Sequence, residues 1–357
     1  MTGVATRIPM ARATRLAIIG FGNVGKALAR LLLSKRDELN ARGVQFVVTG
    51  IFTARHGHVI ARRGLNLEEA LAVDNLWELK PRRPAIGGLE FIRTCPADIA
   101  VEVSTLNPFN GEPALGYITE ALSRSISVVT ANKGPIAFAY PRLMALAREH
   151  SAHILFESTV MDGCPIFSLV RETLPCTRIL GFRAILNSTS NLIIQKVEEG
   201  SSLKQAIAYS QEIGIAETNP SYDLDGYDAQ IKTSILVQVI MGECLPPSKV
   251  ARNGMGHLTE KVIRKAVQQG KHYHLIATAF RNGKDIEASV DVQLLSKDDR
   301  LAFVTGTSNG IFIETDTLRS IFLSEENPGP AQTAYGVLAD CVHVAEALRK
   351  PARKRIS

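Results

Sequence analysis

The sequence predicts an α/β protein in which a doubly wound parallel sheet is followed by an α+β domain. Two observations lead to this prediction. Up to about residue 158, short apolar strands alternate with helical stretches, and this alternation is typical of a parallel sheet with helices on both faces. Beyond residue 158 the alternation ends, which indicates a second domain with its own sheet. The chain of 357 residues is long enough for two domains with sizeable cores.

The first strand and helix, within RLAIIGFGNVGKALARLLL at residues 15–33, are joined by a glycine-rich turn. Gly20 would form the tight turn, Gly22 would let the backbone approach a pyrophosphate, and Gly25 would let the helix pack against the strand. Free N–H groups at the start of the helix favour an anion. Because G-x-G-x-x-G directly follows a strand and opens a helix, it predicts a Rossmann-type site for NAD or NADP, with contacts at Gly20, Gly22, Asn23, Val24 and Gly25. A plain strand–turn–helix without a ligand is the alternative.

The second strand, expected at 44–52, should end beside the adenosine ribose of the cofactor. NAD-preferring sites usually place an Asp or Glu there to bond the 2′-hydroxyl. This chain has Thr53, Ala54, Arg55 and His56 instead, with no acid. A cation at this position can hold a 2′-phosphate, so the sequence favours NADP over NAD, with Arg55 as the contact. Arg55 as a solvated loop residue is the alternative.

Further strands of the same sheet are expected at 98–104, 126–135 and 153–158. The run Thr130-Ala131-Asn132-Lys133 falls at the carboxyl end of one of them, where open α/β sheets bind ligands. Lys133 could therefore reach the substrate or the cofactor. By its position alone, an exposed lysine at a strand end is an equally good interpretation.

The second half of the chain reads as a mixture of strands and helices. Strand-like segments stand at 178–186, 286–295, 302–306 and 310–315, and helical stretches at 189–199, 202–213, 228–241 and 257–269. A last helix at 332–350 follows NPGP and is expected to return and pack on the nucleotide-binding domain. We therefore expect a dinucleotide-binding domain at 1–152, completed by 328–357, and a second domain at 153–327.

The segment GIAETNPSYDLDGYDAQIK, residues 214–232, places four carboxylates ahead of one lysine. The Asp/Gly density predicts a loop, with a helix that begins near Asp228. On a helical period Asp228 and Lys232 share a face with apolar residues, so Lys232 lies in the apolar stripe. A buried ammonium is costly unless it is paired, and Asp228 is its natural partner. An ordinary i,i+4 surface pair is the alternative.

A lysine held in this way can give a proton to the oxygen that becomes an alkoxide when a hydride reaches a carbonyl carbon. In the reverse direction it would act as the base, and the reaction should improve as the pH rises. The surrounding carboxylates indicate a substrate with its own ammonium, such as an amino acid. Carboxylates can also signal a divalent metal, and this alternative stays open.

Composition narrows the class of protein further. The net charge of +6 comes from the tails, because eight basic residues and no acid stand in 1–15 and 349–357, and the body is near neutral. We therefore expect no nucleic-acid partner. The five cysteines form no C-x-x-C pair, which suits the reducing cytoplasm. No run of 18 uncharged apolar residues appears, so we expect a soluble protein without a membrane span.

Six separated motifs make the chain resemble the homoserine dehydrogenase family over about residues 15–348. They are GFGNVG (20–25), TANKGP (130–135), ESTVMDGCP (157–165), LNSTSN (186–191), the acidic segment 214–232 and TAYGVLAD (333–340). The resemblance implies NAD(P)H-dependent reduction of aspartate 4-semialdehyde to homoserine, on the route to threonine and methionine. It also implies a Rossmann domain joined to an α+β catalytic and dimerisation domain, and hence a homodimer.

The resemblance also implies residue roles. Lys232 matches the family's proton-transfer lysine, and Lys133 matches a lysine near the nicotinamide and substrate. Glu217 and Asp228 match substrate-binding acids, Asp223 matches a further active-site acid, and Gly329 lies in a loop near the cofactor. The loop 157–165 corresponds to one that in some members binds a monovalent cation, Na+ or K+, through backbone carbonyls at positions matching Glu157, Val160, Asp162 and Cys164.

Several positions depart from the family pattern. The usual loop is closer to EAxVGGGIP, so Met161, Asp162 and Cys164 differ from it, and Asn219 and Ser188 replace an expected Asp and Gly. NPGPAQ has fewer glycines than the family's glycine-rich GPGAG stretch. These departures leave room for a related dehydrogenase of another small amino-acid semialdehyde, and a non-catalytic NAD(P)-binding regulator is a third alternative. The ACT domain that some members carry is absent from the sequence, so we expect no inhibition by threonine through such a domain.

Overall fold

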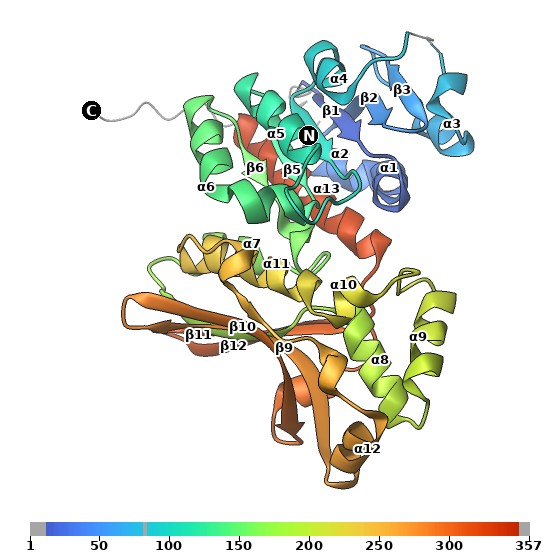
Figure 1. Cartoon of the computed structure of the whole chain (residues 1–357). Helices are drawn as coiled ribbons and strands as arrows, with labels where there is room; N and C mark the ends of the chain where they lie inside the picture. Colours follow the sequence, from blue (N-terminus) through green and yellow to red (C-terminus); the bar gives the residue numbers. More distant parts are fainter. Residues whose placement is uncertain (1–11, 81–83, 350–357) are drawn as a thin grey trace, which may run out of the picture.

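The computed structural model describes residues 12–80 and 84–349, in which two six-stranded sheets form an upper and a lower lobe (Figure 1). The two basic tails that the sequence analysis singled out lie largely outside the described residues. The predicted α/β class, a Rossmann-type sheet joined to an α+β part, is confirmed. The proposed domain boundaries at 152/153 and 327/328 remain predictions.

The upper sheet has the strand order β3-β2-β1-β4-β5-β6. Its strands are β1 (Thr14–Ile19), β2 (Phe46–Thr53), β3 (Gly57–Ile60), β4 (Ile99–Glu102), β5 (Ser127–Thr130) and β6 (Ile154–Leu155). All neighbouring pairs are parallel except β2 and β3. The sequence analysis did not expect β3, because only three residues separate it from β2 and the turn was interpreted as a cofactor contact alone.

Helices cover both faces of the upper sheet because the side chains of β1 alternate between them. Leu16 and Ile18 join a core that includes residues of α1 (Asn23–Ser34), α3 (Leu67–Ala72) and α13 (Pro330–Arg349). Ala17 and Ile19 join the core on the other face, which draws on α4 (Gly88–Thr94), α5 (Ala114–Ser123) and α6 (Lys133–Glu149). A short helix α2 (Arg36–Ala41) follows α1, and Leu76–Glu78 and Glu157–Thr159 are 3-10 turns.

The last helix, α13, returns from the lower lobe and packs against α1 of the upper one, as expected (Figure 1). Val337 and Cys341 on α13 are fully buried, and they share one core with Leu28 and Leu32 of α1. Burying a side chain of this size stabilises a fold by about 1.5–3 kcal/mol. The chain therefore crosses between the lobes twice.

The lower sheet has the order β12-β11-β7-β9-β10-β8. Its strands are β7 (Ile179–Ile185), β8 (Ala251–Arg252), β9 (Lys271–Asn282), β10 (Asp285–Ser296), β11 (Asn309–Thr315) and β12 (Arg319–Glu325). The pairs are antiparallel, apart from β8 and β10. The sequence analysis missed β9 and β12, which extend the predicted strands β10 and β11 into hairpins.

The helices of the lower lobe are α7 (Ile166–Ser168), α8 (Ser188–Glu198), α9 (Leu203–Glu212), α10 (Ser221–Leu224), α11 (Tyr227–Leu236) and α12 (Glu260–Gln268). Leu169–Thr173 and Val237–Met241 are π-helical turns, and Pro247–Lys249, Met255–His257 and Arg300–Phe303 are 3-10 turns. Local sequence determines where two of these helices begin. Ser202 and Gln205 form a capping box on α9, and Thr259 caps α12. No described helix is long and apolar enough to cross a bilayer.

One predicted strand is wrong. Residues 302–306 do not pair with a sheet; the segment lies in and after the 3-10 turn Arg300–Phe303. The Asp299 carboxylate accepts a hydrogen bond from the Leu301 amide at 3.0 Å and starts this turn. Leu301 and Ala302 are buried, but they pack as part of a turn against Ile185 and Ile276. The apolar run signalled burial and not a strand.

Candidate active site

Three glycines shape the turn between β1 and α1. Two of them have no space for a side chain, and the third faces open space. Gly20 has φ +100° and its amide donates to the Phe52 carbonyl at 2.8 Å, so the turn is fixed against β2. A Cβ at Gly20 would collide with the Val103 carbonyl, and one at Gly25 with the Gly20 carbonyl. Nothing lies within 4 Å of where a Gly22 Cβ would be, so a ligand can approach the backbone there.

The amino end of α1 is free to receive an anion. The helix begins at Asn23, and no side chain caps it. Uncapped N–H groups carry the positive end of the helix dipole, which favours a phosphate. A cavity of about 700 Å³ opens at this point, and its wall includes Gly20, Gly22, Asn23 and Arg55 of the predicted cofactor residues. The residues present therefore fit a dinucleotide.

Titratable side chains also line this cavity. Lys26, Arg55 and His56 stand on its wall, and so does Asp74, an acid that the sequence analysis did not consider. Arg55 is exposed and forms no ion pair with a described residue. Of the other predicted cofactor residues, Val24 and Gly25 lie inside α1, and neither they nor Lys133 and Gly329 line this cavity.

A buried carboxylate joins the carboxyl ends of β4 and β5. Glu102 is fully buried, and it accepts hydrogen bonds from the Ser104 amide at 2.9 Å and the Thr130 hydroxyl at 3.0 Å. Burial raises the pKa of Glu102, although these hydrogen bonds oppose the shift. Thr130 in turn accepts from the Asn132 amide at 2.9 Å, and Asn132 caps α6. This network fixes the strand end that presents Lys133.

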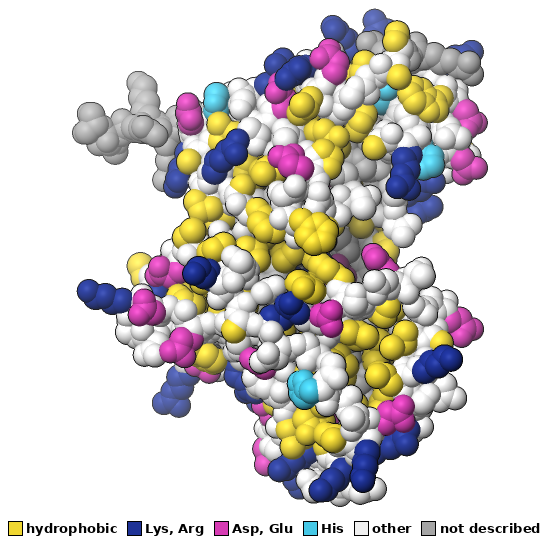
Figure 2. Space-filling view, viewed as in Figure 1, with side chains coloured by type: hydrophobic (Ala, Val, Ile, Leu, Met, Phe, Trp, Pro, Cys, Tyr) yellow, Lys and Arg dark blue, Asp and Glu magenta, His cyan; other side chains and the backbone are white. Residues whose placement is uncertain are grey.

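Lys133, Asp228 and Lys232 meet where α6 of the upper lobe contacts α11 of the lower one, and Figure 2 shows the molecule narrowing between these lobes. Lys133 donates to Asp228 Oδ1, and Lys232 Nζ lies 2.9 Å from Asp228 Oδ2. The Asp228 and Lys232 side chains are 6% and 14% exposed. The predicted pairing of Asp228 with Lys232 in an apolar stripe is therefore present, and the surface-pair alternative does not apply.

Lys232 keeps one donor unused. An ammonium has three hydrogens. One is directed to Asp228 and a second bonds the Leu186 carbonyl at 2.6 Å, while the third has no partner among the described residues. Burial alone lowers the pKa of Lys232, but Asp228, Asp162 and Asp223 outweigh it and the pKa is raised above the ordinary 10.5. The group is therefore a protonated donor with one free hydrogen.

Asp228 stays ionised between the two lysines. Burial would raise its pKa, but Lys133 and Lys232 hold the pKa of this carboxyl well below its usual range. Asp223 behaves in the opposite way, because burial and the Asp228 charge raise its pKa. The pKa values of the two acids are therefore shifted in opposite directions, although the same amide, that of Asn187, bonds both carboxylates.

Asn187 is a site residue that the sequence analysis did not single out. Its Nδ2 donates to Asp223 Oδ1 at 2.7 Å and to Asp228 Oδ2 at 3.0 Å, and its Oδ1 caps α8 through the Ser190 amide at 2.8 Å. One amide thus holds both carboxylates and starts a helix. The available signal was the polar run after strand 178–186, in the motif LNSTSN.

Glu217 is placed differently from the other predicted acids. It is exposed in the loop after α9 and its side chain forms no ion pair with a described residue. Its charge acts on the Tyr222 hydroxyl, as do those of Asp228 and Asp223. The structure thus joins Lys133, Asp228 and Lys232 directly. Asp223 is linked to Asp228 through the Asn187 amide, and Glu217 is exposed and outside these contacts.

The loop 157–165 is tied to α7 and α13. The Glu157 carboxylate accepts from the amides of Phe167 at 2.6 Å and Ser168 at 2.8 Å, so its side chain is occupied by the start of α7. Asp162 adopts φ +29°, where glycine is favoured, and accepts from the Thr333 hydroxyl at 2.8 Å. The Gly163 amide donates to Glu325 Oε1 at 3.1 Å. Thr333 and Glu325 are further residues near the site that the sequence analysis missed.

The cation prediction for this loop rests on backbone carbonyls and stays a prediction. Within residues 12–80 and 84–349, no group of three or more His, Cys, Asp or Glu side chains is arranged to hold a metal ion. Burial raises the pKa of the Cys164 thiol to about 12, so it is a protonated, inert thiol.

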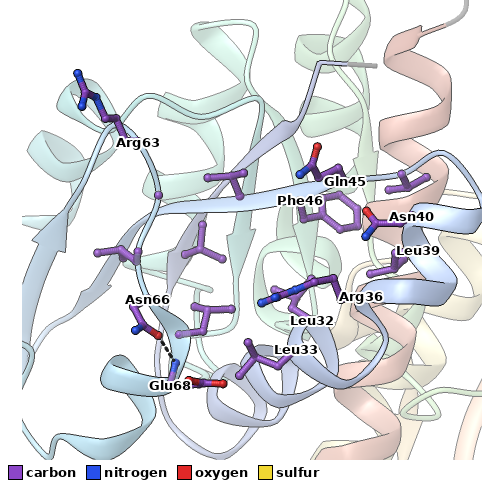
Figure 3. A pocket seen from close by; sticks show the side chains of 16 residues that line it. Leu32, Leu33, Arg36, Leu39, Asn40, Gln45, Phe46, Arg63, Asn66 and Glu68 are labelled. Atoms are coloured by element: carbon purple, nitrogen blue, oxygen red, sulfur yellow. Dashed lines mark hydrogen bonds between the residues drawn. The ribbon is translucent and has the colours of Figure 1, made fainter. Parts of the chain in front are cut away.

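A second cavity of about 550 Å³ lies at the opposite end of β2, between α1, α2 and the loop before α3 (Figure 3). Leucines 32, 33 and 39 and Phe46 line it; Figure 3 shows Arg36 across the opening and Arg63 pointing away. None of the predicted site residues lies on its wall.

A dinucleotide cradle at the amino end of α1, together with a buried lysine that has a free hydrogen, indicates an NAD(P)-dependent oxidoreductase. Two family models match the chain: homoserine dehydrogenase over residues 165–342 and the homoserine dehydrogenase NAD-binding domain over residues 20–157. The chain belongs to the homoserine dehydrogenase family. The resemblance drawn from the motifs is therefore confirmed, and the alternative of a non-catalytic regulator is not supported.

Similar proteins agree over nearly the whole chain. The NAD(+)-dependent homoserine dehydrogenase of Pseudomonas canavaninivorans is 33% identical over 92% of this chain and 96% of its own. The homoserine dehydrogenase of Methanocaldococcus jannaschii is 34% identical over 94% and 99%. Among solved structures, a putative homoserine dehydrogenase of Archaeoglobus fulgidus matches with TM-score 0.84 and 30% identity over 93% and 99%. A hyperthermophilic archaeal homoserine dehydrogenase in complex with NADPH matches with TM-score 0.81 and 32% identity over 95% and 99%.

Proposed function

We propose that the chain interconverts L-homoserine and L-aspartate 4-semialdehyde with NAD(P), in the biosynthesis of threonine and methionine. The observation that carries this proposal is the free hydrogen of the Lys232 ammonium, held in place by Asp228 and the Leu186 carbonyl. The chemistry that a bound nicotinamide supplies is hydride transfer. Lys232 gives the proton to the carbonyl oxygen during reduction and, as the neutral amine, takes it back during oxidation.

The other site residues have separate roles in this proposal. Asp228 orients Lys232 and binds substrate, and Lys133 neutralises Asp228 from the upper lobe while standing near the nicotinamide. Glu217 and Asp223 bind the charged amino-acid head group. The cofactor contacts are Gly20, Gly22, Asn23, Val24, Gly25 and Arg55, with Lys133 and Gly329 nearer the reacting end.

NADP is the preferred cofactor in this proposal. Arg55 stands on the cavity wall without an ion-pair partner among the described residues, so it is available to a 2′-phosphate. Similar proteins use both forms, since one relative is NAD(+)-dependent and one similar structure holds NADPH. We further propose a monovalent cation, Na+ or K+, on the carbonyls of Glu157, Val160, Asp162 and Cys164.

The protein acts, in this proposal, as a homodimer in the cytoplasm. The dimer follows from the family resemblance of the second domain, and light scattering of the purified protein would give twice the chain mass of 38.8 kDa. A monomer mass at micromolar concentration would contradict it.

The test of the function is a panel of amino alcohols assayed with NAD+ and NADP+. Homoserine should give a kcat/KM at least about tenfold above that of each analogue, since a misplaced or missing polar group costs about 1–3 kcal/mol. The second candidate is a dehydrogenase of another small amino-acid semialdehyde, which the departure from the family pattern at Asp162 favours. A higher kcat/KM for an analogue would support that candidate and contradict homoserine.

A further inference from the structure

One buried polar atom beside the Lys133–Asp228–Lys232 group has no partner. The hydroxyl of Tyr222, on the one-turn helix α10, is inaccessible to water and forms no hydrogen bond with a described residue. Buried hydroxyls in native proteins are nearly always bonded, because an unsatisfied one is costly. An unpartnered hydroxyl next to a binding site therefore indicates a ligand group that completes it.

The ring of Tyr222 is held in position. It stacks on Tyr227 with ring centroids 5.9 Å apart and planes 8° from parallel. The Arg252 guanidinium lies 3.6 Å from the centroid of the Tyr227 ring, and it also donates to the Asp225 carbonyl. Tyr222 further packs against the core shared by the two lobes. The hydroxyl is therefore aimed by the stack and is not free to swing to another partner.

The surroundings of the hydroxyl indicate the charge of the missing partner. Three carboxylates act on it: Asp228, Asp223 and Glu217. Burial and these charges raise the pKa of Tyr222, so the hydroxyl stays protonated and neutral. A ligand anion would be repelled here, whereas an ammonium is attracted by the carboxylates and can donate a hydrogen bond to the phenol oxygen.

We propose that the Tyr222 oxygen accepts a hydrogen bond from the α-ammonium group of the amino-acid substrate. This inference rests on the proposed function, and it assigns the ammonium to one side of the site. The Asp223 carboxylate lies next in sequence to Tyr222, and the charge of the exposed Glu217 also acts on the hydroxyl, so the ammonium would be attracted to this side of the site. Lys232 remains for the reacting oxygen at the other end of the substrate.

The test compares Tyr222→Phe with Tyr227→Phe, which removes a hydroxyl from the exposed ring of the same stack. Tyr222→Phe should raise the KM for homoserine about tenfold, as expected for a lost hydrogen bond to a charged group. Its kcat and its KM for the cofactor should stay within about twofold, and Tyr227→Phe should change none of these. An unchanged KM for homoserine in Tyr222→Phe would overturn the inference.

A second comparison uses 4-hydroxybutyrate, which is homoserine without its amino group, as a competitive inhibitor. Tyr222→Phe should leave its Ki within about twofold, because the group that Tyr222 contacts is missing. An equal loss for homoserine and 4-hydroxybutyrate would overturn the assignment to the ammonium. The thermal midpoint of ligand-free Tyr222→Phe should not fall, since the hydroxyl has no partner to lose; a fall would assign it a structural role.

The proposed function can fail separately. If wild-type enzyme prefers another amino alcohol, homoserine is wrong, and the same two comparisons run on that alcohol and its des-amino analogue decide the role of Tyr222. If wild-type enzyme prefers homoserine and Tyr222→Phe behaves as wild type, only the inference fails.

Discussion

The Nζ atom of Lys232 lies 2.9 Å from Oδ2 of Asp228, one turn earlier on the same helix. The other oxygen of that carboxylate accepts from Lys133, which belongs to the upper lobe. One buried carboxylate therefore holds two ammonium groups and joins the two lobes at the site. This arrangement answers why the chain places a lysine in an apolar stripe: the lysine is paired, aimed and left with one free hydrogen.

The Asp228 charge should set the pH dependence of the reaction. Homoserine oxidation needs neutral Lys232, so kcat/KM should rise with pH towards the pKa of Lys232, which Asp228 raises. Asp228→Asn removes the carboxylate but keeps its shape, and burial then lowers the pKa of Lys232. The inflection of the pH–rate profile should therefore move to lower pH. A variant with a reduced rate but an unmoved inflection would show that Asp228 does not tune Lys232.

Replacing Asn187 by serine should reduce turnover without a comparable loss of stability. Asn187→Ser keeps a side chain able to cap α8 but cannot reach both Asp223 and Asp228. We expect kcat/KM for homoserine to fall about tenfold, because hydrogen bonds to charged groups contribute about 1.5–3 kcal/mol. The free energy of unfolding, measured in urea, should change by less than about 1 kcal/mol.

Asn187→Ala is the matched comparison, since it removes the cap as well. It should lose the same activity and about 1 kcal/mol more stability. Equal activity of Asn187→Ser and wild type would mean that the bridging amide does not position the two carboxylates.

Arg55 should distinguish NADP+ from NAD+. Arg55→Ala should raise the KM for NADP+ about tenfold, which corresponds to a lost charge-assisted contact of about 1.4 kcal/mol. The KM for NAD+ should stay within about twofold, because NAD+ lacks the 2′-phosphate. Arg63→Ala, at an exposed arginine that lines the other cavity, serves as the control and should change neither value. An equal rise in the KM values for NADP+ and NAD+ would show that Arg55 does not determine the cofactor preference.

His274 should make the fold sensitive to acid. It is buried on β9 with its Nδ1 2.8 Å from Asn191 Oδ1, and burial, with a smaller effect of His272, lowers its pKa to about 4. Between the ordinary 6.5 and this value, the unfolded chain binds a proton that the folded chain does not, so stability falls as the pH falls. Relative to His274→Gln, wild type should lose about 2–3 kcal/mol of unfolding free energy between pH 7 and 4.5.

Urea unfolding of both proteins at the two pH values measures this difference. The absolute stability of the variant does not matter, because only the change with pH is compared. Parallel losses in wild type and variant would show that His274 titrates normally in the folded state.

Local sequence was enough to predict the cofactor cradle and the Asp228–Lys232 pair. Gly20 and Gly25 have no room for a side chain, so glycine spacing reports the turn directly. The i,i+4 spacing of Asp228 and Lys232 likewise reports one face of one helix. Both features depend on a few neighbouring residues, which is why the sequence alone reveals them.

Contacts between distant segments could not be derived from spacing. Asn187 meets Asp223 and Asp228 across 36 and 41 residues, and Lys133 meets Asp228 across 95. Only the packing of α6 on α11 brings the lysine and the carboxylate together. The strands β9 and β12 were missed for a related reason: each is defined by its partner strand and not by a strong alternation of its own.

Lys232→Ala tests the central claim most directly. The variant leaves Asp228 paired with Lys133, so the buried carboxylate keeps a charged partner. We expect kcat for homoserine oxidation to fall about 10²–10⁴-fold, the usual contribution of a general acid or base. The cofactor should bind as in wild type, as measured by the Kd for NADPH from fluorescence titration. Turnover near the wild-type rate with intact cofactor binding would contradict the assignment of Lys232 as the proton-transfer group.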